Sequence, residues 1–289
     1  MRSVKSLLAA GAASLISSVA FAADMPIAAP PMYAPAPPAD FGGWYLRGDI
    51  GFSNQSVKNI RKSDPTAYSQ ISTLNETTDF DTAGIFDVGV GYRFNNWFRT
   101  DVTAQYRGKS NFKGSDVFTA SAYGVAYNGI DNYNASKSEL LFLANAYVDL
   151  GTWWCVTPFI GAGIGASRVN ISGFTDTGAV NPLVTAGPVV NNGTFPSFAT
   201  AASGSKWNFA WAAHAGLAYK VNPSLTLELA YSYVDLGSGT TGVISDFTGF
   251  SRGNTFKFND ITSHDLKLGV RWDLSSPPVY APPPLVTKG

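Results

Sequence analysis

The sequence predicts an all-β protein, a closed antiparallel eight-stranded transmembrane β-barrel with four long extracellular loops. Three observations lead to this prediction: apolar and polar residues alternate in eight segments, short and long connections alternate between them, and an export signal opens the chain. A period of two places successive side chains on opposite faces of a strand. In a transmembrane barrel the apolar face meets lipid and the polar face lines the lumen.

The start of the chain has the pattern of a secretory signal. Arg2 and Lys5 precede an apolar run that ends in the small-x-small cleavage box Ala20-Phe21-Ala22. We therefore expect residues 1–22 to be a signal peptide. The rest of the chain has no uninterrupted apolar run of the ~18 residues that a spanning helix needs. Export without such a helix favours strands as the membrane-crossing elements.

The composition fits an exported protein that faces something other than water. Only 14% of the 289 residues are charged and 29 are glycine, whereas about a quarter of a typical soluble domain is charged. Without Arg2 and Lys5 the chain has 18 basic and 20 acidic residues, so its net charge of −2 gives no support to nucleic-acid binding. The Cys and His residues lack the spacing of metal ligands. We predict no cofactor, no metal and no catalytic site.

The alternating segments follow one another along residues 43–274, which we predict to be the barrel. Aromatic residues such as Trp207 and Tyr219 stand at both ends of one apolar face, where interfacial girdles lie. Partial alternation in 117–127 and 183–190 leaves ten strands open as an alternative, and we interpret these stretches as hairpin extensions above the membrane. The eight expected segments are 43–53, 84–94, 98–106, 137–150, 156–167, 207–220, 225–233 and 265–274.

Connection lengths indicate the topology. The connections at 95–96, 151–155 and 222–224 are short, and outer-membrane barrels keep their short turns in the periplasm. Both ends of the barrel then lie in the periplasm, together with a proline-rich leader (23–42) and a proline-rich tail (275–289). Their shared Tyr-Ala-Pro kernel is typical of extended polyproline-II segments. The four long connections are 54–81, 108–136, 170–205 and 238–261.

Several motifs carry a family resemblance. They are Gly42-Gly43-Trp44-Tyr45-Leu46-Arg47-Gly48-Asp49-Ile50-Gly51, Gly89-Val90-Gly91-Tyr92-Arg93-Phe94, Pro158-Phe159-Ile160-Gly161-Ala162-Gly163-Ile164-Gly165 and Ser263-His264-Asp265-Leu266-Lys267-Leu268-Gly269-Val270-Arg271-Trp272. In this order they resemble the small porin-like outer-membrane β-barrel proteins of alphaproteobacteria, relatives of the OmpA-type transmembrane barrel.

The resemblance implies a protein of the cell outer membrane with a structural and surface role in envelope integrity. Its implied partners are outer-membrane lipid and lipopolysaccharide and the barrel-insertion machinery, and we add peptidoglycan as an expected partner of the tails. Lys267, Gly269, Trp272 and Leu274 are similar to the assembly signal that this machinery reads. Because fifteen residues follow Leu274, recognition of the signal has to be internal.

The polar faces of the strands predict a charge network in the lumen. An eight-stranded barrel has an interior just wide enough for side chains, and buried charges need partners. We therefore predict a lumen plugged by paired charges, with a narrow ion path, and hence a small-solute porin, as the alternative. The predicted network is Arg47, Asp49, Asp87, Arg93, Arg99, Asp101, Glu139, His214, Glu228, Lys267 and Arg271.

A rim-sited lipid-modifying enzyme is the second alternative. His264 begins the last segment at the expected outer rim, between Ser263 and Asp265. Adjacent residues on a strand point to opposite faces, so these three cannot form a triad by themselves. His214 is expected to face the lumen, and we interpret it as a structural histidine rather than a catalytic base.

Overall fold

The computed structural model describes residues 42–64, 69–122, 125–184, 190–191 and 193–274. The predicted signal peptide, leader and tail lie outside these residues. The described residues all belong to one compact unit, Asp40–Gly289. Within the described ranges, no helix has the length and apolarity to cross a membrane.

The described residues form twelve strands in one sheet, and every pairing between named strands is antiparallel. The strands are β1 (Gly43–Lys62), β2 (Ile71–Phe80), β3 (Ala83–Arg93), β4 (Phe98–Ala122), β5 (Val125–Asp149), β6 (Val156–Val184), β7 (Val190–Asn191), β8 (Phe195–Ala201), β9 (Gly204–Lys220), β10 (Leu225–Thr240), β11 (Ile244–Asp246) and β12 (Phe256–Asp273).

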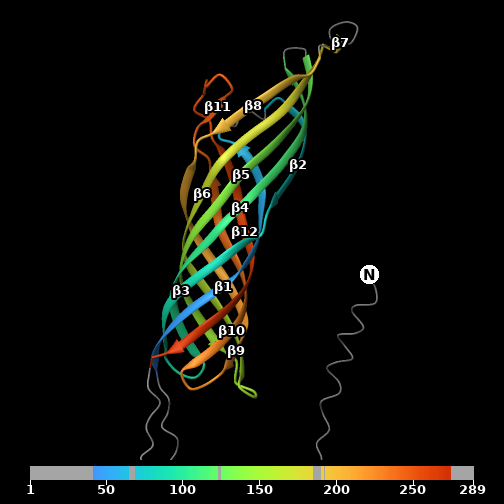
Figure 1. Ribbon diagram of the computed structural model, residues 1–289. Helices are drawn as coiled ribbons and strands as arrows, with labels where there is room; N and C mark the ends of the chain where they lie inside the picture. Colours follow the sequence, from blue (N-terminus) through green and yellow to red (C-terminus); the bar gives the residue numbers. More distant parts are fainter. Residues whose placement is uncertain (1–41, 65–68, 123–124, 185–189, 192, 275–289) are drawn as a thin grey trace, which may run out of the picture. The chain divides into compact units, whose positions relative to one another are not determined.

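Eight of these strands close into a ring (Figure 1). The order around it is β1, β3, β4, β5, β6, β9, β10 and β12, and β12 pairs again with β1. The remaining strands pair outside the ring: β2 with β4, β7 and β8 with β6, and β11 with β8. The prediction of an eight-stranded barrel is therefore confirmed. Closure also leaves the ring without a free edge.

Side chains alternate between the two sides of the ring as the sequence predicts. Leu46 pairs with Trp272 on β12 and with Val90 on β3, and all three side chains point outward and are exposed. The neighbouring row places Arg47 opposite Arg271, and both are buried in the lumen. Apolar residues thus face out and charged residues face in.

The four long connections differ from expectation, because much of each is strand. β4 and β5 continue together as a hairpin as far as Ala122 and Val125, and β6 continues to Val184. The described residues of 117–127 form the end of the β4–β5 hairpin, so the interpretation of this segment as a hairpin extension is confirmed. Part of 183–190 lies outside the described residues. β1 likewise runs nine residues beyond Ser53, to Lys62.

Bulges explain why the sequence pattern was interrupted there. The register shifts between Arg107 and Ser110 in the β4–β5 pair, and again in the β5–β6 and β10–β12 pairs. Gly173 and Gly237 mark two of these shifts, with φ of 63° and 78° that suit glycine. One extra residue moves a strand's inward face from odd to even positions, as from Arg107 to Phe112 on β4. A period-two pattern therefore breaks although the strand continues.

We call the part beyond the bulges the distal extension; it comprises the described residues of 58–81, 109–135, 172–202 and 237–260. Much of its interior is apolar and includes Ile60, Phe112, Phe174, Phe256 and Phe258, although Asp116 and Asp176 are also buried there. Its outer face is largely polar, as in the exposed side-chain hydrogen bond between Thr73 and Thr119. The distal extension thus has the inside-apolar arrangement of a water-soluble β protein.

Candidate functional site

The centre of the lumen network is Glu228 on β10, which three arginines contact. Arg271 Nη1 lies 2.5 Å and Arg99 Nη2 3.3 Å from Glu228 Oε1. Arg47 Nη2 lies 3.6 Å from Oε2. The carboxylate is 2% exposed, so it is shielded from water and depends on these cations for its charge compensation. Strands β1, β4, β10 and β12 are joined across the lumen by this one group.

Arg47 makes the second node of the network. Its Nε donates to Asp49 Oδ2 at 3.0 Å and its Nη2 to Oδ1 at 3.1 Å, which is a bidentate pair. Its Nη1 donates to Asp101 Oδ2 and to the Tyr147 hydroxyl, each at 2.9 Å. The planar guanidinium therefore satisfies groups on β1, β4 and β5 at once.

Arg99 is held by aromatic rings as well as by charge. Its Cζ lies 4.2 Å from the ring centre of Tyr147 and 4.8 Å from that of Phe159. Its Nε lies 3.3 Å from Asp149 Oδ1. Cation–π contacts of a desolvated arginine are worth about 2 kcal/mol or more, so the two rings add to the ion pairs that hold Arg99 in the lumen.

Further ion pairs lie in the part of the lumen between Glu228 and the bulges. Lys267 lies 3.5 Å from Asp87 Oδ2. Glu139 accepts from the Gln55 amide at 3.0 Å and pairs with Lys137.

Arg107 pairs with Asp265 and donates to Ser263 Oγ at 2.9 Å. Ion pairs thus continue up the lumen to the level of the bulges.

Every Asp, Glu, Lys and Arg of the predicted network takes part in an ion pair. His214 is held by hydrogen bonds instead. Its Nδ1 lies 2.8 Å from Ser232 Oγ and its Nε2 lies 3.2 Å from Asn145 Oδ1. Asn145 in turn donates to Asp101 at 2.8 Å, which connects the histidine to the Arg47 node.

Several members of the network lie beyond the predicted set. Tyr45 donates to Asp101 at 3.1 Å, Tyr147 accepts from Arg47, and Lys137 pairs with Glu139. Strand parity already places Tyr45 and Tyr147 on inward faces, but they were overlooked because they carry no formal charge. Lys137 lies next to a bulge, at the edge of a segment expected to be strand.

The charges of the lumen nearly balance. In the described residues, ion pairs join seven cations to eight carboxylates. The cations are Arg47, Arg93, Arg99, Arg107, Lys137, Lys267 and Arg271, and the carboxylates are Asp49, Asp87, Asp101, Glu139, Asp149, Glu228, Asp265 and Asp273.

Glycines on the inward face make room for these large side chains. A Cβ on Gly269 would collide with Asp49 Oδ1, and one on Gly91 would collide with the Tyr45 ring. Of the predicted assembly-signal residues, Lys267 and Gly269 therefore face the lumen. Trp272 and Leu274 lie outside and are more than half exposed. Their spacing reflects the alternation of β12.

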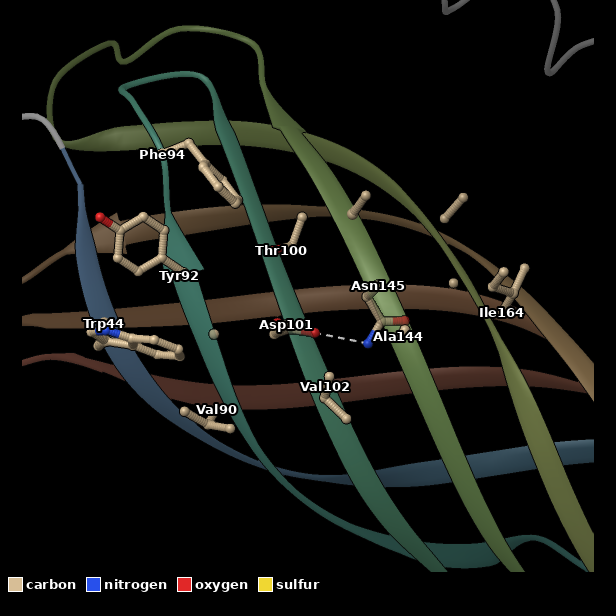
Figure 2. Close-up of a pocket in the computed structure, with 14 residues that line it drawn as sticks. Trp44, Val90, Tyr92, Phe94, Thr100, Asp101, Val102, Ala144, Asn145 and Ile164 are labelled. Carbon is tan, nitrogen blue, oxygen red and sulfur yellow. Dashed lines mark hydrogen bonds between the residues drawn. The ribbon is translucent and has the colours of Figure 1, made fainter.

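The outer wall carries an apolar groove of about 820 Å³. Figure 2 shows Trp44, Tyr92 and Phe94 on one side of it and Ile164 on the other, with Thr100 between. Small side chains on β4, β5 and β6 form its floor. Behind them the Asp101–Asn145 hydrogen bond belongs to the lumen network, so one sheet thickness separates the apolar groove from buried charge.

The predicted rim residues lie on opposite faces, as strand geometry requires. Ser263 and Asp265 point inward to Arg107, whereas His264 is exposed and contacts the Tyr231 hydroxyl at 2.6 Å through Nδ1. The structure does not bring them together as a triad. Within the described part of the chain, no three His, Cys, Asp or Glu side chains are placed to hold a metal ion.

A closed ring with an apolar outer wall and a charge-filled interior defines an integral β-barrel of a membrane. The chain matches the family described as outer membrane protein beta-barrel domain over residues 19–273. It belongs to this family, and it is a protein of the cell outer membrane of Gram-negative bacteria.

The chain is also similar to individual proteins and to solved structures. An uncharacterised protein of Brucella suis is 31% identical over 90% of this chain and 95% of its own length. A Rickettsia bellii protein designated a candidate adhesin is 29% identical over 82% of this chain and 91% of its own. Among solved structures, Neisserial surface protein A is 14% identical, with a TM-score of 0.40, over 80% of this chain and 97% of its own.

Proposed function

We propose that this protein is a closed surface barrel that anchors in the outer membrane, presents the distal extension to the outside and contributes to envelope integrity, without conducting solutes or catalysing a reaction. The observation that carries the proposal is the filling of the interior on two levels. Ion pairs occupy the lumen around Glu228, and buried aromatic side chains, among them Phe112 and Phe258, fill the interior of the distal extension.

An aromatic layer is a strong argument against a small-solute porin. Phe112 and Phe258 meet edge to face with ring centres 5.1 Å apart, and Phe174 and Phe256 lie 4.5 Å apart. All four are at most 1% exposed. A hydrated ion would have to shed its water to pass such a layer, at a cost far larger than these contacts return.

Single-channel recording in planar bilayers tests the closed lumen. We expect refolded protein to give no stable conductance steps. The double variant Phe112→Ser/Phe258→Ser serves as the sensitised comparison, because it removes the aromatic layer and leaves the ion pairs of Glu228 in place. Regular steps from the wild-type protein would support the porin alternative instead.

The surface role is supported by the architecture of the distal extension and by the designation of the Rickettsia relative as a candidate adhesin. The polar outer face of the distal extension lies beyond the apolar band, on the side away from the short turns. Protease added to intact cells is expected to cleave within 170–205 and to spare 222–224. The reverse pattern would invert the proposed orientation. A strain that lacks the protein is expected to become more sensitive to detergent.

Heat-modifiable migration in SDS gels gives the matching control for folding. A closed barrel resists SDS at room temperature because it has no free edge strand at which unfolding can begin.

A separate variant tests for catalysis. His264→Ala is expected to leave lipid A and phospholipid composition unchanged, since Ser263 and Asp265 face away from His264 into the lumen. A change in lipid composition would revive the enzyme alternative.

A further inference from the structure

A polar pocket of about 150 Å³ lies at the end of the lumen that the short turns border. Strands β3, β5, β6, β9, β10 and β12 and two of the short turns contribute to its wall. The charged lining residues are one carboxylate, Asp149, and three cations, Arg93, Lys220 and Arg271. A cavity of this size holds a group about as large as benzene, so it accepts the end of a molecule rather than a whole sugar or nucleotide.

Two of these cations flank a threonine hydroxyl on neighbouring strands. Thr226 on β10 pairs in register with Lys220 on β9 and with Arg271 on β12. Directly paired residues share a face of the sheet, with Cβ atoms about 5 Å apart. Thr226 and Arg271 are buried, and all three residues line the pocket. The row therefore presents an ammonium group, a hydroxyl group and a guanidinium group to the same space.

The carboxylates at this end of the lumen already pair with arginines. The pairs are Arg93 with Asp273 at 3.7 Å, Arg99 with Asp149 at 3.3 Å, and Arg271 with Glu228 at 2.5 Å. Arg271 donates to Glu228 through Nη1, which leaves its Nε and Nη2 donors for the pocket. Among the described residues, none forms an ion pair or a hydrogen bond with the Lys220 ammonium group. The pocket thus contains a cation whose charge the chain does not compensate.

The donors of the pocket suit a singly charged oxyanion. Ammonium and guanidinium groups form charge-assisted hydrogen bonds with carboxylate oxygens, and the planar guanidinium can engage both oxygens at once. Thr152 and Thr157 also line the pocket, and their hydroxyl oxygens lie 2.6 Å apart. Asp149 repels a dianion more strongly than a monoanion, which favours a carboxylate over a phosphate.

We propose that this pocket binds the carboxylate group of a ligand, with Lys220, Thr226 and Arg271 as its direct partners. The inference goes beyond the proposed function and takes one element from it, the orientation that makes the short turns periplasmic. A free small acid and the carboxylate end of a peptide present the same group. The probes of the experiment separate these two sources.

Saturation-transfer NMR of the purified, refolded protein in an uncharged detergent tests the pocket. The probes are propionate, as the free acid, and N-acetyl-alanyl-alanine, as the peptide end. N-acetyl-alanyl-alanine amide is the matched ligand without a charge. We expect saturable binding of at least one carboxylate probe and no saturable binding of the amide. Tighter binding of propionate would identify a free small acid as the ligand, and tighter binding of the dipeptide would identify a peptide end.

Substitutions at Lys220 give the comparison between variants. Lys220→Gln removes an exposed charge that forms no ion pair with the described residues, so the barrel is expected to fold, and heat-modifiable migration checks this. We expect the dissociation constant to rise about tenfold. Lys220→Arg keeps the charge and is expected to bind within about twofold of the wild type. Lys58→Gln is the control, because Lys58 is 71% exposed in the distal extension; we expect less than a twofold change.

Three results would overturn the proposal: no saturable binding of either carboxylate probe, equal binding of the amide, or wild-type affinity in Lys220→Gln. Tighter binding of inorganic phosphate than of both carboxylate probes would overturn it as well, because the charge argument favours a monoanion. Purified protein is used, so these outcomes are independent of the protease experiment that tests the orientation and of the conductance experiment that tests the closed lumen.

Discussion

The lumen and the distal extension are two interiors built from the same strands with opposite chemistry. On β4, Asp101 and Arg107 face inward in the lumen, whereas Phe112 faces inward beyond the bulge. The outer faces are reversed in the same way. Lipid surrounds the first region, which buries charged side chains that lipid does not solvate. Water surrounds the second region, which buries mainly apolar side chains. The bulges let one continuous strand serve both regions.

The comparison predicts the largest effect for loss of a lumen charge. Glu228→Gln leaves three arginines without their shared carboxylate, and breaking a buried pair costs about 3–5 kcal/mol. Urea unfolding of protein inserted in vesicles measures the change. Asp260→Asn is the control, because the Asp260–Lys58 pair is mostly exposed and is worth about 0–1 kcal/mol. Equal losses of stability in Glu228→Gln and Asp260→Asn would mean that water reaches the Glu228 carboxylate in the lumen.

A second prediction compares the outer faces. Leu229 and Val117 are 48% and 51% exposed, but only Leu229 lies in the apolar band. Leu229→Arg should destabilise by about 2–4 kcal/mol if it lies near the bilayer midplane. Val117→Arg should remain within about 0.5 kcal/mol, as for other surface substitutions. Folding into bilayers is the measurement, and similar losses in both variants would contradict the boundary at the bulges.

A third prediction concerns the pH response of the distal extension, through Asp176. Because its folded-state pKa of about 7 exceeds the ordinary value, the folded state binds more protons between pH 4 and pH 7. The distal extension is therefore most stable in acid and loses this stability as pH rises to about 7. Hydrogen exchange of β6 amides beyond Gly173 should accelerate over this range in the wild type. In Asp176→Asn the acceleration beyond the intrinsic exchange rate should be smaller, and a residue of it should remain because burial also raises the pKa values of Asp116 and Asp131.

The smallest effect on barrel stability is expected for changes in the proline-rich leader and tail. We propose that the proline-rich leader and tail contact peptidoglycan, because polyproline-II segments lose little entropy on docking. Deleting residues 25–38 and 275–289 together should leave insertion intact and release the protein from isolated cell-wall sacculi. If truncated and full-length proteins are retained equally, the two segments are spacers.

The barrel can be predicted from the alternation of residues along the chain. Alternation in segments such as 43–53 places Leu46 outside and Arg47 inside without any tertiary information, because the period of a strand is a local property. The predicted lumen charges follow from the same parity. Neutral members such as Tyr147 share this parity, but a pattern of charged residues does not include them.

The tertiary structure alone decided which charges meet and where strands continue. Glu228 joins Arg47, Arg99 and Arg271 from three other strands, and no spacing along the chain encodes that contact. The bulge after Arg107 shifts the alternation by one residue, so a continuing strand has the appearance of a loop in the sequence. The group of Asp116, Asp131 and Asp176 arises from the register of β4, β5 and β6. Register is set by long-range pairing, so the alternation along the chain does not show which of these side chains meet.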